Sequence, residues 1–373
     1  MISRDLPGLL LLEDGRLFRG RAAVPGTRFG EVVFNTSMTG YQEILTDPSY
    51  RGQIVVMTQP HIGNYGVEGA AEESSRPQVE GFVARNFTRQ PSSHASEGTL
   101  PAYLERHGVP ALEGIDTRAV VRHIRKEGAL RGVIASGEPE IEELARELEG
   151  FPTMTGRALA LEVTCDAPRE LPAEGRERAH LALLDFGAKA NIVRSLRQRG
   201  ARLTILPATT PAEEILRLGT NGVVLSNGPG DPEPLRGPIE TIRELLEAEI
   251  PVLGICLGHQ LLGLALGGRT YKMKFGHHGG NQPVLDLATG KTLITSQNHG
   301  FAVDPESLPD GCRVTQRNLN DDSVEAFDVE GKPVVSVQYH PEAAPGPREA
   351  SAIFDRFVDG LQETSAPTPS EAP

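Results

Sequence analysis

From residue 180 onward, short apolar runs alternate with amphipathic stretches. Apolar runs of four to six residues are typical of strands buried on both faces, and the stretches between them have the spacing of helices. The expected strands cover residues 181–186, 202–206, 222–226 and 252–255, and the expected helices cover 191–199, 211–218, 238–248 and 259–266. This alternation predicts an α/β fold with a doubly wound, mostly parallel sheet. After residue 270 the pattern becomes strand-rich, and a helix is expected at 348–359.

The first half of the chain has shorter β-rich runs and fewer helical stretches. Residues 9–12 and 16–19 flank Asp14-Gly15, a pair that tolerates the positive φ angles of a two-residue hairpin turn. Further strands are expected at 31–34, 53–58 and 79–84, and helices at 99–107 and 116–126. Asp116 or Thr117 can cap the last of these helices. We therefore expect a mixed α/β domain up to about residue 165.

Composition changes between the two halves and again near the end of the chain. Residues 166–179 are polar, contain prolines and show no periodicity, which is typical of an exposed linker. We predict an N-terminal domain at 1–165, a linker at 166–179 and a second domain at 180–362. Residues 363–373 are rich in Pro, Ser, Ala and Glu, so we expect a disordered tail there.

The overall charge and the cysteines narrow the possible partners and the compartment. The 373 residues include 37 Lys plus Arg and 50 Asp plus Glu, a net charge of −13 that disfavours binding to nucleic acid. Cys165, Cys256 and Cys312 stand far apart, so neither a disulfide framework nor a zinc knuckle is expected. The first residues lack the basic start of an export signal, and no apolar run reaches the roughly 18 residues of a membrane span. A soluble cytoplasmic protein fits these features best.

The strongest chemical signal is a Gly-Ile-Cys-Leu-Gly sequence at 254–258, between an apolar run and an apolar helix. A cysteine at such a strand-to-helix turn is the thiol counterpart of the nucleophile elbow, where side chains in place of the glycines would clash. Cys256 would also lie at a helix N-terminus, which favours the thiolate. An isolated cysteine is more often a buried structural residue. The strand, the helix and the two glycines favour a nucleophile.

A candidate base for this thiol follows an expected strand at 334–339, in the sequence His340-Pro341-Glu342. Pro341 cannot continue a sheet ladder, so the chain turns there, and strand ends are where doubly wound sheets place their active sites. On an extended segment, side chains two residues apart point to the same side, which would let Glu342 orient the His340 ring. A lone histidine beside a proline is more often structural. The Cys256 motif favours the catalytic interpretation.

Residues 226–232, Ser-Asn-Gly-Pro-Gly-Asp-Pro, follow another buried strand. Gly228 and Gly230 would let backbone N–H groups approach a ligand and stabilise an oxyanion. Most Gly/Pro clusters are only turns. This one gains weight from its position, one strand before Cys256.

Two other sequences suggest chemistry but lack the residues it needs. A phosphate-binding loop at Gly-Lys-Thr 290–292 would need glycine where Leu285 stands, so a hairpin turn is expected. His277 and His278 are adjacent, so their side chains diverge, and no further ligand stands at metal spacing. We expect neither a metal nor a cofactor in this chain.

Taken together, the motifs resemble those of class I, triad-type glutamine amidotransferases. That resemblance is carried by 254–260 (Gly-Ile-Cys-Leu-Gly-His-Gln), 226–232 and 340–342. The first half is similar to the small subunit of carbamoyl-phosphate synthase at 34–50, 60–64 (Pro-His-Ile-Gly-Asn) and 114–118 (Gly-Ile-Asp-Thr-Arg). Residues 276–281 and 297–301 support the same family. The resemblance runs end to end, except for the linker and the tail.

This resemblance implies a glutaminase with Cys256, His340 and Glu342 as its triad. Cys256 would attack the side-chain amide of glutamine to form a glutamyl thioester, with backbone N–H groups of Leu257 and Gly228 holding the oxyanion. His340, oriented by Glu342, would transfer the protons, and the products would be glutamate and ammonia. The implied glutamine-binding residues are Ser37, Gly228, Gly230, Leu257, Gln260, Asn298, Gly300 and Phe301.

The resemblance also implies a partner, because this chain has no nucleotide-phosphate motif. The partner would be a large subunit that uses ATP and magnesium, receives ammonia through a tunnel and makes carbamoyl phosphate from bicarbonate for arginine and pyrimidine synthesis. The two chains would form at least a heterodimer. The N-terminal domain would dock the large subunit and contribute Ser37 to the glutamine site.

Two alternatives stay open at this point. The chain could serve another synthase, such as one of the anthranilate type, although such components usually lack this N-terminal domain. It could also be a non-catalytic regulatory scaffold, but a scaffold does not require the intact triad. Gln59, Ala190 and Gln282 depart from the family pattern and leave partner contacts and packing open.

Overall fold

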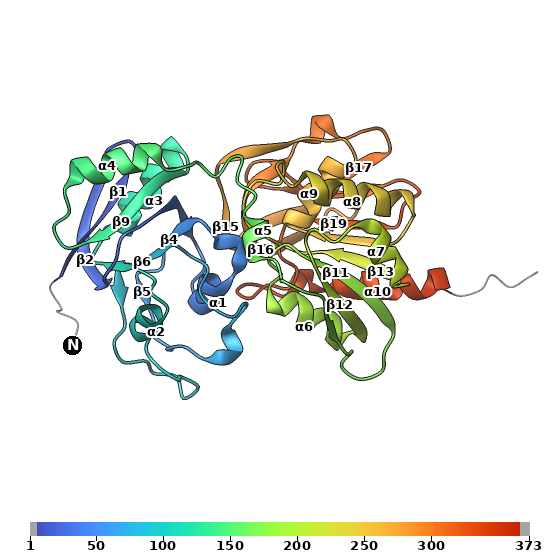
Figure 1. The fold of residues 1–373 in the computed structure, drawn as a ribbon, viewed down its shortest axis with the longest axis horizontal. Helices are drawn as coiled ribbons and strands as arrows, with labels where there is room; N and C mark the ends of the chain where they lie inside the picture. The colour runs from blue at the N-terminus through green and yellow to red at the C-terminus, as the bar shows by residue number, and fades with distance from the viewer. Residues whose placement is uncertain (1–5, 366–373) are drawn as a thin grey trace, which may run out of the picture.

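The computed structural model describes residues 6–365, which form two halves lying side by side (Figure 1). The N-terminal half comprises residues 6–165 and the C-terminal half residues 166–365. No helix within the described range is both long and apolar enough to cross a membrane.

The N-terminal half is built on a closed β-barrel with the strand order β1-β2-β8-β6-β4-β3-β9. Its strands are β1 (Pro7–Leu12), β2 (Leu17–Val24), β3 (Arg28–Asn35), β4 (Gln53–Met57), β6 (Gly81–Val83), β8 (Ala111–Glu113) and β9 (Leu130–Ser136). The expected hairpin joins β1 to β2, and Gly15 in its turn has a φ of 84°. Closure of the barrel depends on β9, which pairs with both β1 and β3.

Short helices surround this barrel. They are α1 (Tyr41–Thr46), η1 (Pro48–Tyr50), η2 (Gly69–Ala71), α2 (Leu100–Arg106), α3 (Thr117–Glu127) and α4 (Ile141–Gly150), with the small pair β5 (His61–Ile62) and β7 (Asn86–Phe87) between them. Asp116 caps α3 as expected, because its Oδ1 accepts a 3.0 Å hydrogen bond from the Ala119 amide. Val120 and Ile124 of α3 pack into the barrel core.

The C-terminal half contains the predicted parallel sheet, in the order β10-β12-β11-β13-β14-β19. Its strands are β10 (Arg169–Leu171), β11 (Ala179–Asp185), β12 (Ala201–Pro207), β13 (Gly222–Leu225), β14 (Val252–Ile255) and β19 (Val334–Val337). All neighbours are parallel except β10, which runs antiparallel to β12. The adjacent ends of β14 and β19 bring Cys256 and the 340–342 segment to the same edge.

Helices cover both faces of this sheet, which explains its continuously apolar strands. The helices α7 (Ala212–Arg217), α8 (Arg236–Glu247) and α9 (Leu257–Ala265) pack on one face. The helices α6 (Ala190–Gln198) and α10 (Ala352–Ser365) pack on the other. Successive strand residues such as Leu183 and Leu184 therefore point into different cores, as a doubly wound sheet requires.

A second, antiparallel sheet has the order β16-β15-β17-β18, and its strands β15 and β16 reach the junction of the halves (Figure 1). Its strands are β15 (Thr270–Asp286), β16 (Thr292–Val303), β17 (Cys312–Asn318) and β18 (Val324–Val329). The 290–292 sequence begins in the tight connection between β15 and β16, which is the expected hairpin. β15 contacts β3, and β16 contacts η1.

The structure corrects three details of the expected domain layout. Residues 169–171 of the expected linker form β10, which gives the edge of β12 a hydrogen-bonded neighbour. Ala160, in the short helix α5 (Ala160–Val163), packs in a core of the C-terminal half. Residues 363–365 of the expected tail belong to α10, and the rest of that tail lies outside the described residues.

Candidate active site

Cys256 lies at the turn between β14 and α9, where it is the N-cap residue of the helix. Its φ of 53° and ψ of −101° are rare for a residue with a side chain, so the backbone here is strained. The side chain is buried, and the sulfur lies 3.7 Å from the backbone oxygen of Asn298 and 3.6 Å from Nε2 of Gln338. The expected elbow geometry is therefore present.

The two flanking glycines are required by close packing. A Cβ on Gly258 would lie 2.3 Å from the backbone oxygen of Leu225, in the neighbouring strand β13. A Cβ on Gly254 would lie 2.5 Å from a side-chain carbon of Leu262. No side chain fits at these distances. Glycine is therefore required at both positions, because α9 packs directly against the sheet.

His340 and Glu342 contact each other at the edge where Cys256 lies. Nδ1 of His340 is 2.6 Å from Oε1 of Glu342, and both side chains are buried. Their contact forms in a turn after β19, not along an extended segment as the sequence spacing suggested. Nε2 of His340 has no hydrogen-bond partner among the described residues. One nitrogen of the ring is thus held by a carboxylate, which leaves the other free to interact with the sulfur of Cys256.

Lys189 completes this buried charge cluster, and sequence reasoning missed it. Its Nζ lies 3.0 Å from Oε1 of Glu342 and also donates to the backbone oxygen of Ala343. The Lys189 side chain is only 2% exposed. It immediately precedes α6 and belongs to no motif that would mark it. Only its burial beside a carboxylate reveals its place in the site.

The cluster fixes the protonation states of its members. Burial alone would lower the pKa of His340, but Glu342 and the sulfur of Cys256 outweigh it and raise this pKa to about 10. Burial alone would raise the pKa of Glu342, but Lys189 and His340 lower it to about 2. The arrangement therefore favours an imidazolium between a carboxylate and the sulfur.

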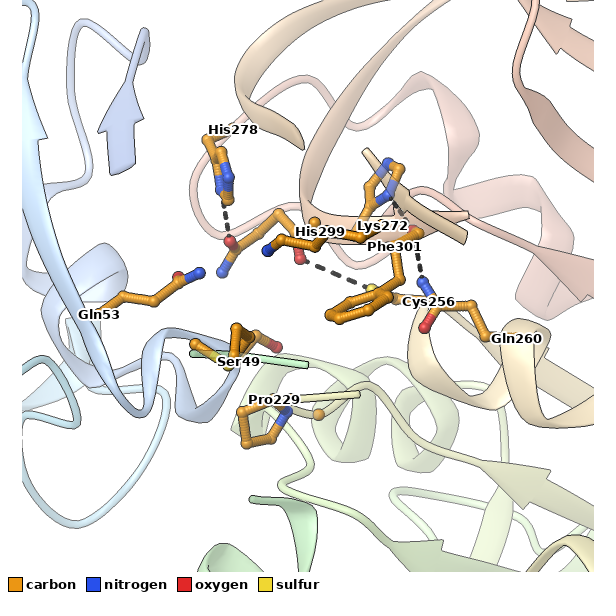
Figure 2. A pocket seen from close by; sticks show the side chains of 14 residues that line it. Ser49, Gln53, Pro229, Cys256, Gln260, Lys272, His278, His299 and Phe301 are labelled. Atoms are coloured by element: carbon orange, nitrogen blue, oxygen red, sulfur yellow. Dashed lines mark hydrogen bonds between the residues drawn. The ribbon is translucent and has the colours of Figure 1, made fainter. Parts of the chain in front are cut away.

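A pocket opens above Cys256 and is lined by both halves of the chain. Figure 2 shows Ser49 and Gln53 reaching it from the N-terminal half, opposite Cys256, Gln260 and Phe301. The remaining lining residues are Met154, Gly228, Pro229, Gly230, Lys272, His278, Asn298, His299 and Gly300. The pocket therefore needs both halves.

Seven of the residues expected at the site line this pocket. They are Gly228, Gly230, Cys256, Gln260, Asn298, Gly300 and Phe301. Leu257, His340 and Glu342 are buried next to it without lining it. Ser37, the remaining residue expected at the site, does not line the pocket.

Ser49, rather than Ser37, lines the pocket from the N-terminal half. Ser37 lies in the connection from β3 to α1, where its buried Oγ has no hydrogen-bond partner among residues 6–365. Ser49 lies in η1, which packs against β16, and its Oγ accepts a 2.9 Å hydrogen bond from Nδ2 of Asn227. Both serines belong to the 34–50 motif. The sequence does not distinguish the two serines, because only the packing of η1 against β16 brings Ser49 to the pocket.

Gln260 and Asn298 are each held by hydrogen bonds to other residues of the chain. Nε2 of Gln260 donates to the backbone oxygen of Phe301 at 2.8 Å. Nδ2 of Asn298 donates to Oδ2 of Asp47 at 3.0 Å, and its Oδ1 lies 2.8 Å from Nδ1 of His278. Asp47 belongs to the N-terminal half, so Asn298 also joins the two halves at the pocket.

Two backbone amides beside Cys256 have no acceptor within the described chain. The Leu257 N–H is in the first turn of α9, where no intrahelical acceptor exists, and no other residue accepts from it. The Gly228 N–H, in the loop after β13, is also without a partner there. A Cβ on Gly228 would lie 2.2 Å from the backbone oxygen of Phe186, so this loop has room only for glycine.

Another buried cluster brings His277 together with His299 and Glu325, with candidate ligand atoms within 4.8 Å of one another. This cluster is not apparent in the sequence, because the three residues lie on different strands. Nδ1 of His277 and Nε2 of His299 both lie 2.9 Å from the same acceptor, Oε1 of Gln297. Nitrogens that donate to an oxygen cannot also bind a metal. The contacts therefore describe a hydrogen-bond network.

Comparisons with known proteins agree with this architecture. Residues 10–134 match the carbamoyl-phosphate synthase small chain CPSase domain, and residues 182–359 match glutamine amidotransferase class-I. The carbamoyl phosphate synthase small chain of Syntrophotalea carbinolica is 49% identical, covering 96% of this chain and 98% of its own. That of Pectobacterium atrosepticum is 50% identical, covering 95% and 97%. The chain belongs to the carbamoyl phosphate synthase small chain family.

Membership of this family confirms the resemblance and the fold class inferred from the motifs. The chain is a glutamine amidotransferase subunit of a ligase complex, and a small chain implies a large subunit as partner. The matched CPSase domain spans most of the barrel, and the amidotransferase domain contains Cys256, His340 and Glu342.

Proposed function

We propose that the chain hydrolyses glutamine with Cys256 as nucleophile and supplies the ammonia to a large subunit that makes carbamoyl phosphate. The observation that carries this proposal is the buried arrangement around Cys256. A strained cysteine at a helix N-terminus lies beside a histidine whose other nitrogen is held by Glu342. This is the arrangement that activates a thiol for acyl transfer.

In the first step, the sulfur of Cys256 forms a bond to the side-chain carbonyl carbon of glutamine. The raised pKa of His340 keeps its ring protonated, so it can donate a proton to the departing nitrogen. The C–N bond breaks, ammonia leaves, and a glutamyl thioester remains. The unpaired N–H groups of Leu257 and Gly228 are suited to stabilise the oxyanion.

In the second step, water hydrolyses the thioester. His340, now neutral, takes a proton from the water as it attacks the thioester carbon. The C–S bond breaks, the thiolate returns, and glutamate is released. Glu342 and Lys189 stay charged throughout, which keeps the ring oriented in both steps.

We assign glutamine binding to the pocket residues, with one change from the sequence expectation. Ser49 replaces Ser37 as the serine from the N-terminal half, because Ser49 lines the pocket. The remaining binding residues are Gly228, Gly230, Leu257, Gln260, Asn298, Gly300 and Phe301. Leu257 would contribute its backbone, since its side chain does not line the pocket.

We further propose that ammonia passes directly to an ATP-using large subunit and that the N-terminal half docks it. The CPSase-domain match over residues 10–134 favours this partner over an anthranilate-type synthase. The intact arrangement of Cys256, His340 and Glu342 argues against a non-catalytic scaffold.

Ammonia release from glutamine tests this proposal. We would compare the wild-type chain with Cys256→Ser, each with and without the large subunit. We expect release by the wild type, a rise when the partner is added, and loss of activity in the variant. A wild type that stays inactive with its partner would contradict the proposed role of Cys256.

A further inference from the structure

Glu73 belongs to the N-terminal half but binds the first turn of α6 in the C-terminal half. Its Oε2 accepts a 2.9 Å hydrogen bond from the Asn191 amide, and its backbone oxygen accepts one of 2.9 Å from the Ala190 amide. Its Oε1 forms an ion pair with Arg194. A single residue therefore makes three contacts with the beginning of a helix more than 100 positions later in the sequence.

The start of α6 needs this help from outside. Its N-cap residue is Lys189, whose side chain makes no capping hydrogen bond because it points to Glu342 instead. The amides of the first turn have no intrahelical acceptors, and a carboxylate is the preferred partner at this positive end of the helix. Glu73 supplies the acceptor; it is only 1% exposed, and burial raises its pKa to about 7 although Lys189, the Asn191 amide and Arg194 favour the ionised form.

The same helix start holds the triad carboxylate. Lys189 pairs with the Glu342 side chain at 3.0 Å, and Nδ2 of Asn191 donates to the backbone oxygen of Glu342. Glu342 in turn holds His340 at 2.6 Å. A continuous chain of short contacts therefore runs from Glu73 through the start of α6 to the histidine beside Cys256.

Glu73 is also anchored within its own half. Its amide donates a 2.9 Å hydrogen bond to Oγ1 of Thr46, at the end of α1. Glu73 is therefore tied to α1 of the N-terminal half through its amide, and to the start of α6 through its backbone oxygen and its side chain. Its contacts join the two halves at this point.

We propose that Glu73 is a positioning residue for the triad, acting through the start of α6 on Glu342. It touches neither substrate nor reacting atoms, since it does not line the Cys256 pocket. Its contribution is to keep Lys189 and Asn191 where they hold Glu342. This role rests on the proposed glutaminase function. It means that the N-terminal half helps to position the triad as well as lining the pocket.

The test compares Glu73→Ala and Glu73→Gln in the complex with the large subunit. Glutamine-dependent ammonia release should fall roughly tenfold to a hundredfold in kcat for Glu73→Ala, as expected when reacting groups are misplaced. Glu73→Gln keeps an acceptor for the Asn191 amide but loses the Arg194 ion pair. Its kcat should therefore lie between those of the wild type and Glu73→Ala. In both, KM for glutamine should stay within about twofold, because the pocket itself is unchanged.

The KM readout separates positioning from a loosened structure. Ser49 and Gln53 bring the N-terminal half into the pocket, so a general separation of the halves would raise KM. Glu72→Gln is the matched control, since Glu72 is the adjacent residue and contacts Tyr103 within its own half. We expect Glu72→Gln to behave like wild type in both kcat and KM.

Each result has a defined meaning. If the wild type releases no ammonia from glutamine, the proposed function fails. If the wild type is active and Glu73→Gln has the kcat of Glu72→Gln, the positioning role is overturned, even if Glu73→Ala does not fold. A rise in KM without a fall in kcat would also overturn it and would assign Glu73 to domain packing alone. Carbamoyl phosphate synthesis from added ammonia should be unaffected, which checks that the large subunit is active, and co-elution of the two chains in gel filtration checks that the complex is intact.

Discussion

At the scale of single residues, the site is a line of alternating buried charges. Lys189, Glu342 and His340 are nearly inaccessible to solvent, so each charge is tolerated only because its neighbour has the opposite sign. The sequence indicated His340 and Glu342 through their spacing. It could not indicate Lys189, because the pairing arises only when the start of α6 folds against the turn after β19.

The raised pKa of His340 predicts a particular pH dependence of stability. A histidine in the unfolded chain has a pKa of about 6.5, whereas that of folded His340 is about 10. Its protonated form is therefore favoured by folding. The stabilisation is fully present below about pH 6.5 and is lost as the pH rises towards 10. We expect the difference in free energy of unfolding between wild type and His340→Asn to decrease over this range.

Urea denaturation at a series of pH values measures this difference. His61→Asn, at an exposed position, is the control variant. A gap between wild type and His340→Asn that widens with increasing pH would show that the histidine is held neutral.

At the scale of elements, helices and strands that depend on local sequence patterns were predicted, whereas those that depend on pairing between distant residues were not. In the C-terminal half, the strands were predicted because their apolar runs are buried on both faces, and the helices because their apolar residues recur at helical spacing. The closed barrel was not, because β9 must pair with β1 and β3 about 100 residues earlier in the chain, and no local pattern encodes that pairing. The strand β10 was missed because its exposed, polar sequence resembles a linker.

The turn from β14 to α9 predicts the effect of one added methyl group. Gly258→Ala would place a Cβ 2.3 Å from the backbone oxygen of Leu225, and a backbone atom in a sheet cannot move aside. We expect a loss of about 2–4 kcal/mol in the free energy of unfolding, as for other severe overpacking. Gly237→Ala in α8 is the matched control, because nothing lies within 4 Å of its Cβ position.

Both variants can be compared by denaturant unfolding. Gly237→Ala should change stability by less than about 1 kcal/mol, since alanine is the better helix former. Equal stability of the two variants would mean that α9 can shift away from β13, and the argument from close packing would then be wrong.

At the scale of the whole molecule, the two halves meet through buried polar contacts. Asp47 accepts from Asn298, Ser49 accepts from Asn227, and Glu73 accepts from the Asn191 amide. Buried polar groups need specific partners, so such an interface fixes one relative position of the halves. Serines, asparagines and acidic residues in loops give no sequence signal of burial, which is why Ser49 could not be told from Ser37.

Asp47 offers the sharpest test of this interface. The side chain is 4% exposed and accepts hydrogen bonds from Nδ2 of Asn298 at 3.0 Å and from the Ser49 amide at 2.9 Å. Asp47→Ala leaves these donors buried without an acceptor, at a cost of about 1–3 kcal/mol each. Because Asn298 and Ser49 line the pocket, we expect KM for glutamine to rise several-fold as well.

Calorimetry together with glutaminase kinetics separates this effect from ordinary destabilisation. Asp116→Ala removes the cap of α3 in the same half and should cost about 1 kcal/mol without changing KM, because no residue of α3 lines the pocket. If Asp47→Ala lowers stability but leaves KM at the wild-type value, the interface holds the halves together without shaping the pocket. A joint change in stability and KM would mean that docking of the two halves and glutamine binding depend on the same hydrogen bonds.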